Sequence, residues 1–362
     1  MTNKIYINAR FLTQKITGVQ RFAIEISLVL HQLLGDKIVF LAPHGEMEAS
    51  DFTKKVPVSS IGRNKGHIWE QIDLPLYLNR INRPLLINLC NAAPIFYKNK
   101  ISTIHDVAYL RYPKSYSKSF LLLYKLMIPR ILKTSRHIFT VSEFSKSEIK
   151  LFYPKKIRGK DITVIYNAVD DNFKPLTDPK LNGTSYLVAV SSLNERKNLH
   201  AVLTSFVNLN EKKLLTKDIF LYIIGDLKSV SFKTLDFGKY QKHSQIKFLG
   251  RIGDQDLVRY YSNAAGFIYP SLYEGFGIPP LEAQKCGCPV IVSNVSSLPE
   301  VFGDSALYCD PHNIDSLTKA IKVVLTDKDL KRSLIEKGYG NVARFSWLSS
   351  GQRIVEVLKM YF

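Results

Sequence analysis

The sequence is poor in cysteine and has no long apolar run. Its four cysteines show neither CxxC nor zinc-like spacing, which argues against a disulfide framework and favours a reducing compartment. No stretch approaches the roughly 18 uninterrupted apolar residues of a membrane-spanning helix. The amino-terminal MTNKIYINARF also lacks the apolar core of a secretory signal. We therefore expect a cytoplasmic chain that is neither secreted nor membrane-spanning.

Missing motifs disfavour two classes of function. The first apolar strand is followed by ARFLTQKITGVQRF (9–22), which has no GxGxxG, and no acidic residue about 20 positions on completes a dinucleotide fingerprint. This disfavours a nicotinamide-dependent oxidoreductase. No nucleic-acid-reading module is recognisable, so a nucleic-acid-binding protein is supported by charge alone, and we expect no nucleic-acid partner.

Acidic residues are also scarce, since 31 Asp and Glu face 50 Lys and Arg and give a net charge of +19. Such a charge calls for an acidic partner, either nucleic acid, anionic lipid or a nucleotide. Residues 111–136 contain no acid and interleave basic residues with FLLLYKLMIP, which predicts a basic amphipathic helix bent at Pro129. Its apolar residues suit a protein core, but we favour contact with an anionic membrane surface, where each basic residue adds about 1 kcal/mol. The basic residues are Arg111, Lys114, Lys118, Lys125, Arg130, Lys133 and Arg136.

Strand and helix patterns alternate along the chain, as in parallel α/β sheets. One series runs from KIYINA (4–9) to HIFTVS (137–142), and a second from YLVAVSS (186–192) to ALYCD (306–310). The Asp-, Pro- and Lys-rich stretch 171–183 separates them like a linker. We predict two doubly wound domains, 1–172 and 183–344, followed by a helix over 345–362.

Residues 271–294, SLYEGFGIPPLEAQKCGCPVIVSN, combine two carboxylates with a glycine-rich turn. The prolines at 279 and 280 fit only a loop end and the first turn of a helix, so a helix is predicted to begin near Pro280. Glu274 precedes the turn, and Glu282 falls in the predicted first turn of the helix. The N–H groups around this turn form an anion site when they point outward. They belong to Gly275, Phe276, Gly277 and Ile278.

A sugar nucleotide matches this combination. Neither carboxylate can face a phosphate without repulsion, but both accept hydrogen bonds from hydroxyls, and a sugar nucleotide carries phosphates between two hydroxyl-bearing rings. Glu282 alone is explained equally well as a glutamate favoured by the helix dipole. The prediction therefore rests on the pair Glu274 and Glu282 around the turn.

Other candidate residues follow predicted strands, where doubly wound sheets bind ligands. Arg196 and Lys197 come between a strand and a helix and suit a diphosphate, although either one alone could belong to a solvated loop. Gly18 opens a helix but by itself marks only a turn. His105 ends the strand ISTI, and a lone histidine is more often structural. Asp106 either orients that imidazole or caps the next turn.

Asp254 and Asp256 in GDQDL (253–257) resemble a DxD metal site. We reject that interpretation because Asp254 also fits the N-cap of the following helix, and because two cations already serve the diphosphate. We therefore predict that the protein needs no metal and no cofactor.

The chain resembles the retaining glycosyltransferases of family 4, which have the GT-B architecture. EGFGIPPLEAQKCGCPVIVS (274–293) matches their Glu-x7-Glu block, and further pieces occur in the family's order along nearly the whole length. One departure is Ser191 and Ser192, where relatives usually have Gly-Thr or Gly-Ser. The other matching pieces are TGVQRF (17–22), STIHDVAYLRYP (102–113), FTVSEFSKSEI (139–149), VIYNAVD (164–170), SSLNERKNL (191–199), FLGRIGDQDL (248–257) and SSLPEVFGDSALYCDP (296–311).

The resemblance implies two Rossmann-like domains facing across a cleft, with the carboxyl-terminal helix packed on the first, acceptor-side domain. It implies that Arg196, Lys197 and the backbone at Gly18 neutralise the diphosphate, and that His105 lies beside the transferred sugar. It also implies that Glu274 holds sugar hydroxyls, that Glu282 binds the ribose, and that backbone around Ile252 cradles the base.

The implied reaction is transfer from a nucleotide sugar to an acceptor hydroxyl with retention. We expect a lipid-linked or oligosaccharide acceptor in bacterial O-antigen or capsule synthesis, at the inner face of the plasma membrane. GDP-mannose is the favoured donor, with dTDP-rhamnose and UDP-sugars as alternatives. A non-catalytic sugar-nucleotide binder also remains open, and donor turnover discriminates it.

Overall fold

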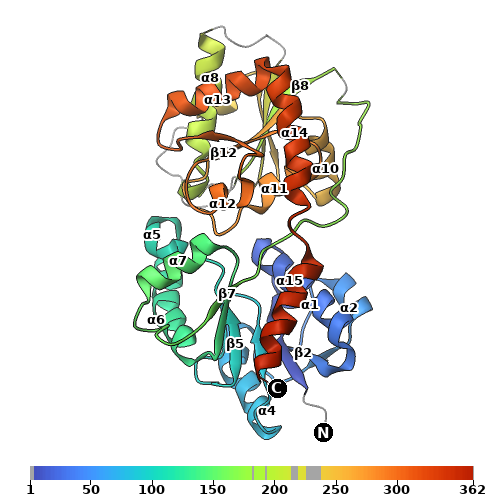
Figure 1. Cartoon of the computed structure of the whole chain (residues 1–362), viewed down its shortest axis with the longest axis vertical. Helices are drawn as coiled ribbons and strands as arrows, with labels where there is room; N and C mark the ends of the chain where they lie inside the picture. Colours follow the sequence, from blue (N-terminus) through green and yellow to red (C-terminus); the bar gives the residue numbers. More distant parts are fainter. Residues whose placement is uncertain (1–3, 182, 192–193, 213–218, 226–237, 362) are drawn as a thin grey trace. The chain divides into compact units, whose positions relative to one another are not determined.

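The computed structural model describes residues 4–181, 183–191, 194–212, 219–225 and 238–361 (Figure 1). The chain forms two compact units. The first unit comprises Met1–Asn167 with Ser346–Phe362, and the second comprises Ala168–Phe345. The segment 171–183, expected as a linker, is part of the second unit.

The first unit is built on a seven-stranded parallel sheet with the order β3-β2-β1-β4-β5-β6-β7. Its central strands are almost fully buried, as expected for a sheet covered by helices on both faces. The strands are β1 (Ile5–Asn8), β2 (Ile38–Ala42), β3 (Val58–Ser60), β4 (Leu86–Asn88), β5 (Lys100–Thr103), β6 (His137–Thr140) and β7 (Ile162–Val164).

The strand pattern in the sequence missed the two edge strands, β3 and β7. Each has only three residues, and β3 is half-exposed to exposed, so neither produces a sustained apolar run. Short, partly polar edge strands are common because an edge needs protection from further pairing. The predicted doubly wound architecture is otherwise confirmed.

The first unit's helices connect these strands. They are α1 (Gly18–Leu34), α2 (Ser50–Lys55), α3 (Gly66–Ile68), α4 (Leu74–Arg80), α5 (Ala108–Arg111), α6 (Lys118–Thr134) and α7 (Glu143–Phe152). A π-helical segment, Trp69–Asp73, joins α3 to α4.

The basic helix predicted over 111–136 is shorter in the structure. Pro113 stands in a separate short turn, and α6 begins only after Ser117, whose hydroxyl accepts from the N–H of Phe120 at 3.3 Å. Ser117 is therefore the N-cap. Pro129 lies inside α6, which continues to Thr134.

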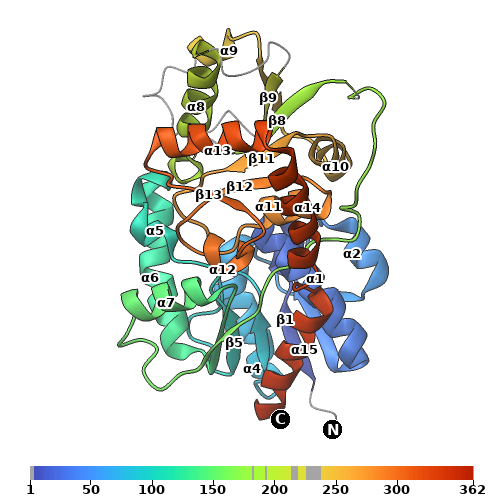
Figure 2. The same ribbon diagram turned by 45° about the horizontal axis from the view of Figure 1, so that its top comes forward.

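The carboxyl-terminal helix α15 (Trp347–Leu358) returns to the first unit and packs against α1, as predicted (Figures 1 and 2). Gly351 makes this approach close: a Cβ there would lie 2.3 Å from Cγ1 of Val29. After α15, the ring of Tyr361 lies 4.6 Å from the guanidinium carbon of Arg136.

The second unit has a six-stranded parallel sheet with the order β10-β9-β8-β11-β12-β13. Its strands are β8 (Ser185–Val190), β9 (Ile219–Ile224), β10 (Ile246–Gly250), β11 (Gly266–Tyr269), β12 (Val290–Ser293) and β13 (Leu307–Cys309). Its helices are α8 (Leu199–Glu211), α9 (Gly238–Gln241), α10 (Asp254–Ser262), α11 (Ile278–Lys285), α12 (Leu298–Phe302), α13 (Ile314–Thr326) and α14 (Lys328–Val342).

Candidate functional site

The strand order of the second sheet reverses between β8 and β11, which are neighbours although β9 and β10 lie between them in sequence. Open α/β sheets bind ligands outside the carboxyl ends of their strands at such a reversal. The segment after β8 carries Arg196 and Lys197 in a 3₁₀ turn, and the segment after β11 carries Glu274. The fold therefore brings these three predicted site residues to one place.

Lys197 and Glu274 form a direct ion pair with 2.7 Å between Nζ and Oε1. The Lys197 ammonium also donates to the hydroxyl of Tyr269 and lies 4.8 Å from the centre of that ring. The sequence predicted both residues as members of one site but did not predict this ion pair.

Buried surroundings shape the ionisation of Glu274, which is 9% exposed. Burial alone raises the pKa of this carboxyl group, but the charges of Lys197 and Arg196 more than compensate and leave the pKa below its ordinary value. Glu274 is therefore an acceptor of hydrogen bonds at neutral pH and not a proton donor. This property matches its predicted role as a holder of hydroxyl groups.

Two further contacts join the segments that follow β8 and β11. The N–H of Leu272 donates to the carbonyl of Arg196 at 2.7 Å, and the Asn198 amide donates to the carbonyl of Pro270 at 3.1 Å. Asn198 has a left-handed backbone (φ 54°) that ends the turn holding the two cations. Ser191, directly after β8, is buried and its N–H donates to the carbonyl of Ile224 at 2.9 Å, whereas Ser192 lies outside the described residues.

The glycine-rich turn ends at Gly277, whose backbone is left-handed (φ 106°). A Cβ there would lie 2.7 Å from Cδ2 of Leu298, so only glycine fits both the conformation and the space. The hydroxyl of Ser297 donates toward the carbonyl oxygens of Glu274 and Phe276, at 3.0 and 3.1 Å. This holds the turn that contains Gly275 against α12.

Helix α11 begins at Ile278, two residues before Pro280. Glu282 consequently lies in the second turn of the helix, and the prediction of a first-turn position is wrong. The prediction placed the prolines too close to the helix start. They are the second and third helical residues, where a missing N–H also costs no intrahelical hydrogen bond. Glu282 is 7% exposed, and its charge contributes to a raised pKa of Tyr261, after the larger effect of burial.

Ile252 lies in the loop between β10 and α10 and is half-buried. The N-cap of α10 is Gly253, not Asp254, which is the first helical residue. The predicted cap was therefore misplaced by one position, because Gly253 already supplies the extended backbone that precedes the helix. Asp256 forms an ion pair with Arg259 at 3.1 Å. In the described part of the chain, no three His, Cys, Asp or Glu side chains cluster in a way that could hold a metal ion.

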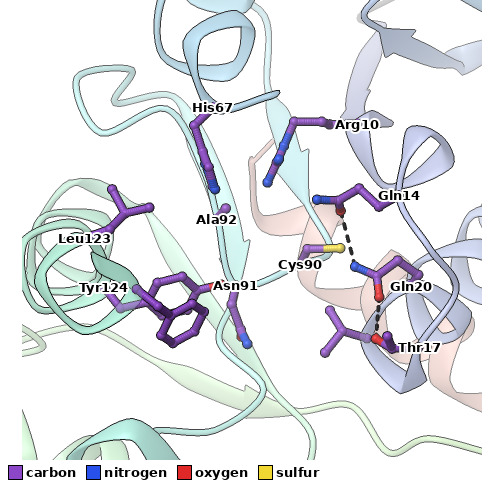
Figure 3. Close-up of a pocket in the computed structure, with 12 residues that line it drawn as sticks. Arg10, Gln14, Thr17, Gln20, His67, Cys90, Asn91, Ala92, Leu123 and Tyr124 are labelled. Carbon is purple, nitrogen blue, oxygen red and sulfur yellow. Dashed lines mark hydrogen bonds between the residues drawn. The ribbon is translucent and has the colours of Figure 1, made fainter. Parts of the chain in front are cut away.

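The first sheet reverses its strand order between β1 and β4. A pocket of about 350 Å³ lies where these strands end, with residues from the segments that follow the two strands and from α1, α3 and α6 in its wall (Figure 3). Its lining residues are Arg10, Gln14, Thr17, Val19, Gln20, His67, Cys90, Asn91, Ala92, Phe120, Leu123 and Tyr124.

A buried carboxylate, Glu70, organises one side of this pocket and is only 1% exposed. It accepts from Asn8 at 2.8 Å and from Nε of Arg10 at 3.2 Å, and its other oxygen lies 3.2 Å from Nδ1 of His67. Burial raises the pKa of this carboxyl group, but His67, Arg10 and Asn8 outweigh it and hold the pKa below its ordinary value. The Asn8 amide also donates to Asn88 at 3.0 Å.

The structure places both predicted residues of the first unit next to this pocket. Gly18 is the first residue of α1, and its neighbours Thr17 and Val19 line the pocket. The N–H of His105 donates to Oδ1 of Asn91, another lining residue, at 2.7 Å.

The His105 side chain is buried and fixed. Its Nε2 lies 2.9 Å from the carbonyl of Leu89, which requires the proton on Nε2. The imidazole and the Phe22 ring meet edge to face, with 4.8 Å between their centres. Burial lowers the pKa of this imidazole, so it is neutral at neutral pH. Asp106 accepts from the N–H of Ala108 at 3.0 Å. Of the two roles expected for Asp106, this contact corresponds to capping of the next turn.

Sequence reasoning missed Arg10, His67 and Glu70. A usable signal existed, because Asn8 and Asn88 end two largely apolar strands, and buried amides require partners. The position of Glu70 had no such signal. It depends on the π-helical segment, and π-helical segments often occur at functional sites.

Comparison with known proteins identifies the family. Residues 176–341 match the profile of "Glycosyl transferases group 1", and residues 16–173 match "Glycosyltransferase Family 4". O-antigen chain mannosyltransferase B of Escherichia coli is 30% identical over 284 residues, covering 74% of this chain and 73% of that protein. O-antigen chain mannosyltransferase RfbU of Salmonella typhimurium is 30% identical over 245 residues, covering 67% of this chain and 65% of that protein.

Solved structures agree in fold. Sucrose-phosphate synthase from Thermosynechococcus elongatus superposes with a TM-score of 0.76 at 17% identity, covering 99% of both chains. Anabaena HepE, solved in complex with UDP-glucose, gives a TM-score of 0.71 at 15% identity, covering 98% of this chain and 99% of that one. The chain belongs to glycosyltransferase family 4, and its predicted GT-B class of fold is confirmed. It is a glycosyltransferase.

Proposed function

We propose that the second unit binds a nucleotide sugar at the reversal point of its sheet and that the enzyme transfers the sugar with retention at the anomeric carbon. The observation that carries this proposal is the Lys197–Glu274 pair beside the amino-terminal turn of α11. An ammonium has three N–H donors, and Glu274 and Tyr269 engage two of those of Lys197. In this proposal, the third N–H of Lys197 donates to a diphosphate oxygen of the donor.

Stabilisation of the departing diphosphate is the central catalytic task in this proposal. The negative charge that develops on the leaving oxygen is best stabilised by preorganised hydrogen-bond donors in a site from which most water is excluded. Arg196, Lys197 and the start of α11 are the groups of the second unit that supply them. Glu274 holds hydroxyls of the transferred sugar, and Glu282 holds the ribose. No carboxylate acts as a nucleophile, and the diphosphate accepts the proton of the acceptor hydroxyl.

The donor is GDP-mannose in this proposal, and the acceptor is a lipid-linked or oligosaccharide glycan of O-antigen assembly. Two relatives with the printed name of O-antigen mannosyltransferase support both choices. A screen of donor turnover across GDP-, UDP- and dTDP-sugars tests them. Release of nucleotide from GDP-mannose alone is the expected result. Turnover of only UDP- or dTDP-sugars would show that the donor is one of those sugars and not GDP-mannose. Absence of any turnover would favour a non-catalytic binder.

The roles predicted for Gly18 and His105 stay predictions, as does independence from metal. Full activity in excess EDTA is the expected outcome for the latter. Loss of turnover in EDTA with recovery on adding Mg²⁺ or Mn²⁺ would contradict it.

We further propose that α6 binds an anionic membrane. Its exposed face combines Leu122 and Leu126, which are 64% and 51% exposed, with basic residues. A second stripe of exposed apolar residues, spaced four apart, runs along α3, the π-helical segment and α4. Apolar side chains flanked by positive charge fit an anionic lipid surface. The basic residues of α6 are Lys118, Lys125, Arg130 and Lys133, and the second stripe consists of Ile68, Ile72 and Leu76. No helix among the described residues is long and apolar enough to cross a bilayer.

A further inference from the structure

The chain passes between its two units twice. It enters the second unit at Ala168 and leaves it after Phe345. We call 168–171 the first crossing segment and 344–345 the second crossing segment. Within the second unit, each of them contacts the elements that carry the proposed donor site, which are the glycine-rich turn and helix α11.

Lys285, the last residue of α11, holds the first crossing segment. Its ammonium donates to the carbonyls of Val169 and Asp170, both at 3.0 Å, and to Oδ1 of Asp171 at 2.8 Å. The hydrogen bond and the charge of Lys285 hold the pKa of Asp171 below its ordinary value. An ammonium has three N–H groups, so those of Lys285 are all used on one short segment.

The second crossing segment contacts both the turn and the helix. The ring of Phe345 meets that of Phe276, in the glycine-rich turn, edge to face with 5.3 Å between their centres. Arg344 donates to Oδ1 of Asn341 at 2.7 Å, and the Asn341 amide donates to Gln284 of α11 at 2.8 Å. A chain of buried contacts therefore runs from the donor elements to the end of the second unit.

Polar contacts of this kind fix the position of α11. Its residues 280–284 are all buried, so the helix has no single apolar stripe that sets its orientation. Gln284 is 1% exposed and donates to the carbonyl and the hydroxyl of Ser305, at 2.9 and 2.8 Å. Because a buried amide that loses its partners is costly, these bonds favour one position of the helix. Glu282 lies on the same helix, so the position of its carboxylate follows that of α11.

We infer that Lys285 and Phe345 are positioning residues of the donor site and that they couple binding of a nucleoside diphosphate to the order of the two crossing segments. Lys285 fixes the carboxyl end of α11, and Phe345 fixes the turn through Phe276. This inference rests on the donor site proposed for the second unit. Such a coupling is reciprocal: a bound nucleotide holds the crossing segments more firmly, and a change that loosens them weakens nucleotide binding.

Two measurements on the full chain test the inference. Calorimetric titration with GDP, UDP and dTDP gives the affinity, and hydrogen exchange followed by mass spectrometry gives the order of the crossing segments. In the wild type, we expect the bound nucleotide to slow exchange in both segments. Lys285→Met should bind the nucleotide about tenfold more weakly and lose the slowing at 168–171. Phe345→Leu should bind more weakly and lose much of the slowing at 344–345.

Matched variants separate positioning from general stability. Lys285→Arg keeps the charge and the N–H donors and should restore most of the affinity and of the slowing. Lys337→Met removes an exposed ion pair of the same unit, between Lys337 on α14 and Asp304 at 2.9 Å, and should behave like the wild type. An unchanged exchange pattern in the strands of the second sheet shows that Lys285→Met loses affinity without unfolding.

The possible failures are distinguishable. Nucleotide binding to the wild type without slower exchange in either crossing segment would overturn the inference, and this measurement needs no variant. Wild-type affinity of Lys285→Met would also overturn it. In both cases the proposed donor site stands. Failure of the wild type to bind any of the three nucleotides would overturn the donor site and the inference together.

Discussion

Lys197 and Glu274, which are 77 residues apart in sequence, meet with 2.7 Å between Nζ and Oε1 where the strand order of the second sheet reverses. Each side chain thereby removes the cost of burying the other's charge. The pKa of Glu274 lies below its ordinary value because Lys197 and Arg196 overcome the effect of burial. This carboxylate therefore stabilises the fold above its unfolded pKa, and the stability is lost as the pH falls through its folded pKa.

Replacing Lys197 by Met should destabilise the second unit by about 3 kcal/mol at pH 7, because a buried carboxylate loses its partner. The deficit should shrink toward pH 4, because protonation of Glu274 then removes the unpaired charge. Thermal melting at both pH values measures this, with the double variant Lys197→Met/Glu274→Gln as the control that regains most of the loss. A deficit independent of pH would show that lost packing, and not charge, is responsible.

Arg196→Ala and Glu282→Ala should affect different kinetic constants. Arg196 is assigned to the leaving diphosphate, so its removal should lower kcat by a factor of about 100 with a smaller change in donor KM. Glu282 is assigned to the ribose, whose binding is the same in the ground state and the transition state. Its removal should raise donor KM with little change in kcat. Steady-state kinetics with varied donor measure both, and the reverse pattern would exchange the two assignments.

Gly277→Ala should weaken donor binding and cost about 2 kcal/mol or more, since a side chain there is strained in conformation and meets Leu298. Gly340→Ala is the matched control. Gly340 lies within α14 with nothing within 4 Å of an added Cβ, so the change should stabilise by about 0.5–1 kcal/mol. Melting curves and nucleotide titration measure the two effects. Wild-type behaviour of Gly277→Ala would mean that the turn relaxes freely.

Leu122→Ser/Leu126→Ser should reduce flotation with anionic vesicles at low salt, while binding to neutral vesicles stays low throughout. Leu151→Ser is the control, because Leu151 is 61% exposed but lies on α7. Equal flotation of the double variant and the wild type would locate membrane binding elsewhere. Failure of the wild type to bind anionic vesicles would remove the proposal for α6.

Lys100 should make the stability of the first unit rise with pH. Burial, with a smaller contribution from Lys160, lowers the pKa of its ammonium to about 7 from 10.5. Between these values the unfolded chain holds a proton that the folded chain has released. Raising the pH therefore favours folding, by up to about 1.4 kcal/mol per pH unit.

Lys100→Met removes this dependence, so its advantage in melting temperature over the wild type should be larger at pH 7 than at pH 9. The exposed neighbour Lys98, changed to Met, serves as the control and should show no such trend. An equal shift of Lys100→Met at both pH values would mean that Lys100 does not titrate in this range.

The sequence predicted the architecture because long apolar strands alternating with amphipathic helices admit few arrangements. It also placed Arg196 and Lys197 correctly between a strand and a helix, and Glu274 correctly before the glycine-rich turn, since these positions follow directly from the neighbouring elements. The ion pair between Lys197 and Glu274 was not predictable in this way, because it depends on which strands become neighbours.

Local details were harder to predict. The start of α11 was ambiguous because a helix tolerates proline at several positions of its first turn, and the position of Glu70 depends on a π-helical segment with no simple periodicity. The contact between Arg10 and Glu70 joins residues 60 apart through the crossover from β3 to β4. Sequence patterns report neighbours along an element, whereas such contacts are fixed by the packing of elements that are distant in the chain.

The packing of α15 on α1 has a consequence for the order in which the protein forms during synthesis. The ribosome delivers the residues of the first unit in two portions, with all of Ala168–Phe345 between them. Until Trp347–Leu358 emerges, the surface of α1 around Val29 stays without the helix that covers it. The second unit is continuous in sequence and can be completed earlier. The amino-terminal unit is thus the last to finish, contrary to the usual order for nascent chains.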